Sequence, residues 1–358
     1  MRVMVTGGTG FVGPHTVQHL VNDGHEVHLL VRSSDRIAPA LEPLGVEGVT
    51  HTVGDVTDAK SVEAAMERCD SVAHAASVYT VYKRQDAVIR RVNVPGAEIV
   101  LGAAHYLGLD PIVHVSSIVA LFPPEGQTLT VQSPVKNPAR TYPRSKADLE
   151  RVVRRFQEEV IPVVITYPGG VYGSHDPHWD EGPQLIANIL KGQVSMIPKG
   201  GVPIVDVRDV AKVHAAVMEP GRGSQRYMIT GAYKPFGDTI NAVAALTGRK
   251  IRVATLPAMA LVPAVRLMDA LLSIAPFRLP SSREGFESLL MDPHVDDSPT
   301  IDELGIQRTM PFEETLAGMV RWMYQSGGIS AKLAGKLAEL MIFSMTIAEF
   351  PSKGALFE

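Results

Sequence analysis

The chain has 358 residues, of which 45% are hydrophobic and 20% charged, and its formal net charge is −4 at pH 7. This length allows a large buried core and two structural lobes, and the composition is that of a globular protein. A weakly negative chain has no general attraction to nucleic acid or anionic lipid, so we expect neither as a partner.

Cysteine and histidine usage excludes two further classes of chemistry. Cys69 is the only cysteine, so no internal disulfide can form, and the 12 histidines lack HExxH or any comparable ligand spacing. We therefore expect no bound metal. No signal-like apolar run precedes the first predicted strand, and we expect a protein of the reducing cytoplasm.

The first half of the chain alternates short apolar runs with amphipathic helical patterns, which is the order of parallel βαβ units. Strands are predicted at residues 3–6, 25–31, 49–53, 71–75, 112–116 and 163–167. Helices are predicted at residues 11–23, 58–68, 88–106 and 142–159. The fold class that follows is α/β, a Rossmann-type doubly wound parallel sheet with a smaller, mixed α/β C-terminal substrate lobe.

The rhythm changes after residue 168, where glycine and proline become dense. We predict a dinucleotide-binding domain at residues 1–168, to which the strand and helix within 204–232 return. The substrate-binding lobe then comprises residues 169–203 and 233–326, followed by an amphipathic tail.

Two apolar stretches need separate interpretation: residues 256–277 and the tail at 327–358. The first contains prolines and charged residues, which disfavour a membrane span, and we expect it to cover an apolar substrate pocket. We expect the tail to dock on its own domain or on a neighbouring subunit. Contact of either stretch with a membrane surface is the less favoured alternative.

The sequence TGGTGFVG follows the first predicted strand directly and opens the first helix. Gly7 permits a tight turn, Gly10 lets the backbone approach a pyrophosphate, and Gly13 allows close packing of helix on sheet. Phe11 and Val12 complete the loop at the helix N-terminus, where backbone N–H groups and the helix dipole favour phosphate. The pattern predicts a dinucleotide site.

The end of the second predicted strand bears on the choice of cofactor. It carries Arg32, with Arg36 nearby, where NAD sites usually have an acid. A guanidinium there can bind a 2′-phosphate through two hydrogen bonds, so NADP(H) is favoured and NAD(H) remains possible. Asp55 and Val56, after the third strand, are candidates for contact with adenine, although Asp55 also suits a plain turn.

Tyr142 and Lys146 lie four residues apart at a predicted helix start, so phenol and ammonium share one helix face. A nearby cation favours the phenolate, which brings the phenol toward working pH. Ser117 lies at the end of the fifth predicted strand, directly after residue 116, at the edge of the sheet where ligands bind. These three residues form the predicted catalytic set.

Together these motifs resemble those of the extended short-chain dehydrogenases/reductases, within the NAD-dependent epimerase/dehydratase superfamily. The resemblance covers about the first 235 residues, with GDVTD, HAAS, VNVPG, VSS, YPRSK, PGGVYG and VDVRDVAKVH in the family's order. It implies hydride chemistry through Ser117, Tyr142 and Lys146, and suggests a homodimer. It also implies cofactor contacts, beyond those of the glycine turn, at Ala75, Ala76, Tyr142, Lys146, Tyr167, Pro168, Gly170 and Val171, with Asn93 as a weaker support.

The sequence departs from the family's pattern at three places, and those at Ser117 and before the VxD segment help to choose among its activities. Ser117 is followed by Ile118 and Val119, where dehydratases need an acid pair, and Tyr167 stands where many members have arginine. The arginine that sugar-nucleotide epimerases place before the VxD segment is also missing, although Lys199 lies close by. The sequence most resembles dihydroflavonol-reductase-like and 3β-hydroxysteroid-dehydrogenase-like members.

The function expected is therefore an NADP(H)-dependent interconversion of a ketone and a secondary alcohol on an apolar small molecule. An NAD-dependent sugar-nucleotide epimerase is the alternative. A non-catalytic NADP-binding sensor is a further one.

Overall fold

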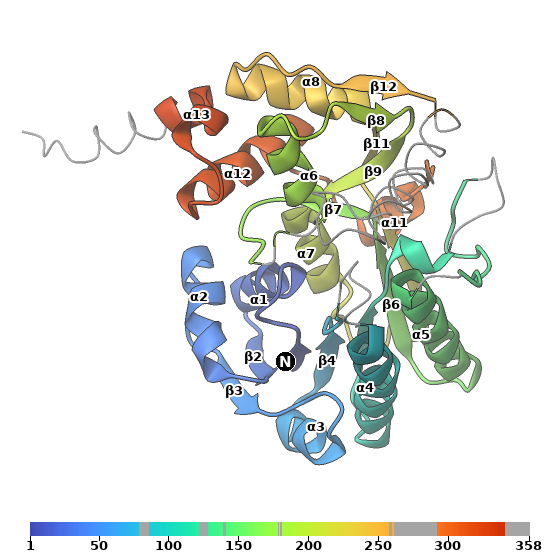
Figure 1. The fold of residues 1–358 in the computed structure, drawn as a ribbon. Helices are drawn as coiled ribbons and strands as arrows, with labels where there is room; N and C mark the ends of the chain where they lie inside the picture. Colours follow the sequence, from blue (N-terminus) through green and yellow to red (C-terminus); the bar gives the residue numbers. More distant parts are fainter. Residues whose placement is uncertain are drawn as a thin grey trace, which may run out of the picture.

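A computed structural model describes residues 1–78, 86–121, 128–138, 141–177, 179, 181–257, 260 and 292–340. Its centre is a seven-stranded parallel sheet with the strand order β10-β6-β5-β4-β1-β2-β3 (Figure 1). The strands are β1 Arg2–Thr6, β2 Glu26–Val31, β3 Thr50–Val53, β4 Ser71–His74, β5 Ile112–Val115, β6 Val163–Pro168 and β10 Arg226–Ile229. The predicted α/β fold class is confirmed.

Strand β1 is the point at which the strand order reverses. It pairs with β2 on one side and with β4 on the other, so the chain fills one half of the sheet before it begins the second. In sheets of this kind the loops after the two central strands diverge and leave a crevice at the carboxyl edge. The segments that follow β1 and β4 border that crevice.

Helices cover both faces of the sheet, because alternate strand residues point to opposite sides. Val3 and Val5 belong to one core cluster and Met4 to the other. The first face is covered by α1 Val12–Asn22, α2 Ile37–Leu41 and α7 Val207–Ala216. The second is covered by α3 Ala59–Met66, α4 Asp86–Tyr106 and α5 Thr141–Glu158. The bounds of the strands β1 to β6 and of helices α1, α3, α4 and α5 agree with the predicted elements within about two residues, whereas α2 was not predicted.

A smaller lobe is built over the carboxyl edge, at the top of Figure 1. Its strands are β7 Gly170–Tyr172, β8 Met196–Pro198, β9 Gly201–Asp206, β11 Ala232–Pro235 and β12 Ala254–Leu256. Its helices are α6 Glu181–Leu190, α8 Phe236–Thr247, α12 Phe312–Gln325 and α13 Ala331–Ala334. They share a separate apolar core, in which Tyr172, Phe236 and Leu316 are buried.

The return of the chain to the first lobe differs in detail from the expectation. Strand β9 lies in the small sheet, between β7 and β11, and not in the large one. The return is made by α7, which packs on α1, and by β10, which extends the large sheet beside β6. Helix α7 begins at Val207, because the Asp206 carboxylate caps it by accepting a hydrogen bond from the Arg208 backbone N–H.

Two expectations fall partly or wholly outside the described residues. Most of the apolar stretch 256–277 and the tail beyond residue 340 lie there. Within the part of the chain that is described, no helix combines the length and apolar character needed to cross a bilayer. That same part brings together no group of three side chains suited to holding a metal ion.

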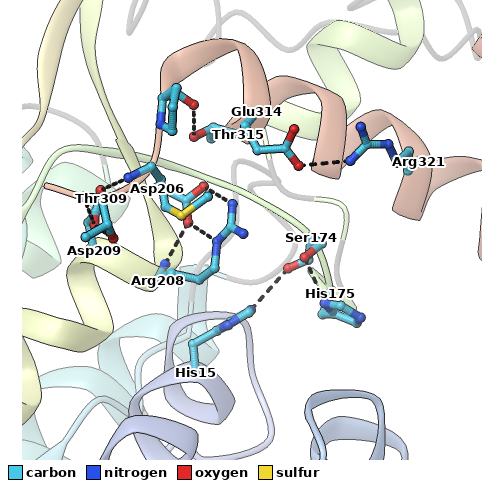
Figure 2. A network of polar contacts seen from close by, with 12 residues as sticks. His15, Ser174, His175, Asp206, Arg208, Asp209, Thr309, Glu314, Thr315 and Arg321 are labelled. Atoms are coloured by element: carbon cyan, nitrogen blue, oxygen red, sulfur yellow. Dashed lines mark hydrogen bonds and ion pairs between the residues drawn. The ribbon is translucent and has the colours of Figure 1, made fainter. Parts of the chain in front are cut away.

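Polar contacts from two separate segments of the small lobe join it to the large lobe (Figure 2). The loop after β7 is tied to α1 through Ser174, whose carbonyl lies 3.2 Å from His15 Nε2. On the other side, Asp209 of α7 accepts hydrogen bonds from Thr309 N and Oγ1, both 3.0 Å, just before α12. The small lobe is therefore fastened to helices α1 and α7 of the large one.

A buried histidine links α7 to both of its neighbours. His214 has its Nδ1 2.9 Å from Thr16 Oγ1 of α1 and its Nε2 3.1 Å from Thr166 Oγ1 of β6. The side chain is fully buried, and this burial, with a smaller effect of His19, lowers the pKa of His214 to about 3. The ring therefore stays neutral in the folded protein at any ordinary pH.

This linkage predicts acid sensitivity. An unfolded histidine protonates below its ordinary pKa of 6.5, whereas folded His214 does not, so stability falls as pH drops from about 6.5 toward 3. We expect His214 to account for a loss of about 2 kcal/mol at pH 5. Urea unfolding at pH 7.5 and pH 5 should show the loss in wild type and a smaller one in His214→Gln. Equal losses in the two proteins would contradict this assignment.

Candidate active site

The glycine turn between β1 and α1 is compact and leaves no room for a side chain at Gly7 or Gly13. Gly10 N donates to Gly7 O at 3.0 Å, and Gly7 has a φ of 75°, a conformation that favours glycine. A Cβ on Gly13 would lie 2.0 Å from Gly7 O. The three glycines thus bring bare backbone to the N-terminus of α1, as the sequence predicted.

This turn also packs against the end of β4. A Cβ on Gly7 would lie 2.7 Å from the carbonyl carbon of Ala75 and from Ala76 N. Ala75 N donates to Thr6 O and Ala76 N to Thr6 Oγ1, both at 3.2 Å, while Thr6 Oγ1 lies 2.8 Å from His74 Nδ1. The predicted residues Ala75 and Ala76 are therefore held beside the turn.

Thr6 and His74 were not predicted as site residues. Their signal in the sequence is that each is the polar last residue of an apolar strand, at the edge where ligands bind.

The first turn of α1 suits an anion. Phe11 precedes the helix and Val12 begins it, and no side chain caps its N-terminus. No acidic residue lies in that first turn. The N–H groups of the turn and the positive end of the helix dipole therefore face the crevice unopposed. Together with the bare glycine backbone, this arrangement fits a dinucleotide pyrophosphate.

Basic and acidic side chains gather at the ends of β2 and β3. Arg32 and Arg36 are both exposed, and Asp55 accepts hydrogen bonds from Thr57 N at 2.9 Å and Thr57 Oγ1 at 2.7 Å. Partial burial would raise the pKa of Asp55, but these bonds and the charges of Arg32 and Arg91 bring it below its usual value. Arg32 is thus close to Asp55, and Arg91 of α4 is a neighbouring cation that the sequence did not indicate.

Val56 follows Asp55 and lies against α4. A Cβ on Gly96 would come within 2.8 Å of the Val56 side chain, so that glycine lets strand end and helix approach closely. The contact holds the segment after β3 against α4.

Helix α5 carries the predicted catalytic pair in its first two turns. Tyr142 is partly buried, whereas Lys146 is only 5% exposed. Ser117 is the second residue after β5, and the short 3₁₀ helix after it, Ile118–Leu121, packs on α5. Ser117 Oγ accepts a hydrogen bond from Val119 N at 3.2 Å, which leaves its O–H available as a donor. The three predicted residues therefore belong to neighbouring elements at one edge of the sheet.

Two buried histidines lie close to Lys146. His74 of β4 and His114 of β5 stack with their ring centroids 5.5 Å apart. Burial lowers the pKa of His74 to about 3 and that of His114 well below its usual value, and the Lys146 charge contributes to both shifts. Burial also lowers the pKa of Lys146 to about 8, against the opposing effect of the Glu150 carboxylate.

The segment predicted to pass the nicotinamide divides into two parts. The Tyr167 side chain is fully buried and donates a hydrogen bond to Glu150 Oε1 at 2.6 Å, so its phenol points into the α5 interface. Pro168 ends β6, and Gly170 and Val171, both partly exposed, begin β7. Tyr167 can therefore contact a cofactor only through its backbone. The predicted cofactor contacts of Pro168, Gly170 and Val171 stay predictions.

Asn93 joins three elements around the site. Its Oδ1 accepts from Val78 N at 2.8 Å, and its Nδ2 donates to Val78 O at 3.1 Å and to Ser145 Oγ at 3.3 Å. It ties α4 to the segment after β4 and to the residue beside Lys146, in accordance with a supporting role.

Comparison with known proteins identifies the family. The sequence model of the NAD dependent epimerase/dehydratase family matches residues 3–230. The chain belongs to this family, and its resemblance to the extended short-chain dehydrogenases/reductases is confirmed. It is accordingly an enzyme that acts on CH–OH groups with NAD(P).

Two curated relatives match most of the chain. A putative dihydroflavonol 4-reductase of Synechocystis sp. is 27% identical over 92% of this chain and 96% of its own length. A 4-hydroxy-2-methyl-3-oxo-4-farnesyl-3,4-dihydroquinoline-1-oxide ketoreductase of Stigmatella aurantiaca is 29% identical over 85% and 91%. Among solved structures, UDP-glucose 4-epimerase from Bifidobacterium longum, in complex with NAD⁺ and UDP, superposes with a TM-score of 0.70. It is 20% identical, over 91% of this chain and 99% of that one, and shares the fold.

Proposed function

We propose that the chain is an NADP(H)-dependent oxidoreductase that interconverts a ketone and a secondary alcohol on an apolar small molecule. The observation that carries the proposal is the buried Lys146, one helical turn from Tyr142 on a helix that packs against the segment after β5. Relatives named as a dihydroflavonol reductase and a ketoreductase, matched over most of the chain, support the same reaction class. The homodimer that the family resemblance implies is part of the proposal.

Each residue of the set has a separate task. Tyr142 donates its phenolic proton to the carbonyl oxygen in reduction and takes it back in oxidation. The Lys146 ammonium stabilises the phenolate and binds the nicotinamide ribose. Ser117 donates a hydrogen bond to the substrate oxygen and so orients it. A bound nicotinamide supplies or accepts the hydride.

The residues after Ser117 argue against water elimination. Ile118 is buried, and Val119 uses its backbone N–H to bond Ser117 Oγ, so neither provides an acid or a base. Proton transfer at one oxygen is therefore the chemistry that this edge of the sheet supports, which favours simple carbonyl–alcohol exchange.

The Tyr142→Phe variant tests the reaction. The rate at which the variant reduces a dihydroflavonol and a panel of apolar ketones, measured as NADPH consumption, should fall by about 10³-fold because the proton donor is gone. NADPH affinity, measured by fluorescence, should stay within about 2-fold of wild type, since the ring remains.

The matched control for this test is Tyr106→Phe, which makes the same change on an exposed side chain at the end of α4 and should leave turnover unchanged. Near-normal turnover in Tyr142→Phe would overturn the mechanism.

The preference for NADP(H) rests on Arg32 and has its own test. Wild type should show a larger rise in melting temperature with NADP⁺ than with NAD⁺ at equal concentration. Arg32→Ala should lose that difference, because the 2′-phosphate loses a guanidinium partner. Arg155→Ala, which removes an exposed arginine paired with Glu98 at 3.4 Å, should retain it. Stabilisation of wild type by NAD⁺ and not NADP⁺ would refute the assignment.

An NAD-dependent sugar-nucleotide epimerase is the second candidate. The fold shared with an epimerase that holds NAD⁺ and UDP favours it, and exposed Lys199 before β9 is a possible cation for a diphosphate. A rise in melting temperature with UDP, together with NAD that co-purifies, would select this candidate over the first.

A further inference from the structure

Glu150 is a completely buried carboxylate on α5, one turn after Lys146 and two turns after Tyr142. Its Oε1 accepts hydrogen bonds from Tyr167 Oη at 2.6 Å and Arg154 Nε at 2.7 Å, and its Oε2 accepts one from Ser116 Oγ at 2.8 Å. A buried charge is tolerated only when such partners replace water. The three donors come from β6, α5 itself and the end of β5.

Glu150 shares a helix face with Lys146, because residues four apart in a helix lie one above the other. Both side chains are withdrawn from water, with Lys146 5% and Glu150 0% exposed. Because little solvent screens the two groups from each other, the Glu150 charge acts on Lys146 and opposes the lowering of its pKa by burial. The proposed function gives Lys146 a task in the reaction and gives none to Glu150.

The other titratable groups around Lys146 do not supply a negative charge. From the strands, His74 and His114 have strongly lowered pKa values, so both rings are neutral. Burial, reinforced by Glu150, raises the pKa of Tyr167 well above its usual value, so the phenol is neutral as well. On α5, Arg154 is a cation, and Tyr142 is the phenol whose phenolate the Lys146 ammonium stabilises.

Tyr167 makes the surroundings of Glu150 in this chain different from those expected in many family members. It stands where many family members have arginine, and it donates a hydrogen bond to Glu150 without adding a second cation. Arg154, one turn further along α5, provides the single guanidinium that bonds the carboxylate. Part of the negative charge of Glu150 therefore remains effective toward Lys146.

We propose that Glu150 is a positioning residue whose charge keeps Lys146 in the ammonium form and whose hydrogen bonds hold α5 on strands β5 and β6. The inference deepens the proposed function, since it assumes that the ammonium form of Lys146 is the useful one. It assigns no contact with substrate to Glu150.

The direct test is a pH titration of Lys146, observed by NMR in protein labelled with ¹³C at the lysine Cε. The Lys146 signal is assigned as the one that is missing in Lys146→Met. An ammonium that loses a neighbouring anion gives up its proton more easily, so the midpoint in Glu150→Gln should move down by about 1 pH unit. Glu150→Asp should restore a midpoint close to wild type, because it returns the charge.

Two further variants separate charge from structure. Glu98→Gln makes the same change on the exposed face of α4 and should not move the Lys146 midpoint. Tyr167→Phe removes a hydrogen bond to Glu150 but leaves its charge, so it should lower the melting temperature without moving the midpoint. If Glu150→Gln does not fold, Glu150→Gln/Arg154→Met leaves no unpaired guanidinium and should also lower the midpoint.

An unchanged Lys146 midpoint in a folded Glu150→Gln variant overturns the inference. The NMR readout needs no turnover, so it stands apart from the test of the reaction by Tyr142→Phe. Where turnover is measurable, the fall in kcat/KM at alkaline pH should move to lower pH in Glu150→Gln by the same amount as the midpoint.

Discussion

Lys146 is a lysine side chain in a place that water barely reaches, and the organisation of the candidate active site depends on stabilising its ammonium form. Burial alone drives a lysine toward its neutral form. The opposing interaction comes from Glu150, which is itself stabilised by donors from two strands and its own helix. Helix α5 therefore cannot slide or rotate on the sheet without separating several buried polar groups at once. Because Tyr142 lies at the start of that helix, its position is fixed by the same contacts.

The reversal of strand order at β1 provides the other half of the site. Because β1 lies between β2 and β4, the glycine turn and the end of β4 meet at one crevice. There the Thr6 hydroxyl forms hydrogen bonds with both Ala76 N and the His74 ring. His74 in turn stacks on His114, which lies close to Lys146. Hydrogen bonds at Thr6, the stacked histidine rings and the electrostatic effect of Lys146 on His114 thus link the turn that suits a pyrophosphate to the helix that carries Tyr142.

Local patterns predicted those parts of the protein that local physics determines. The glycine turn, the alternation of strands and helices, and the spacing of Tyr142 and Lys146 are written within short segments, and the elements agree closely with expectation. Glu150, Tyr167 and Ser116 meet only in the folded chain, because they lie on different elements. The placement of β9 in the small sheet was missed for a related reason, since an apolar run does not specify which strand it will pair with.

The central claim is that the carboxyl edge between β1 and α5 is where hydride and proton are exchanged. A crystal structure with NADP⁺ bound tests it most directly. The account predicts the pyrophosphate on the glycine turn and Lys146 Nζ within about 3 Å of a hydroxyl of the nicotinamide ribose. It also predicts that the Tyr142 hydroxyl faces the nicotinamide ring. A nicotinamide that lies away from α5, with Lys146 contacting protein alone, would contradict it.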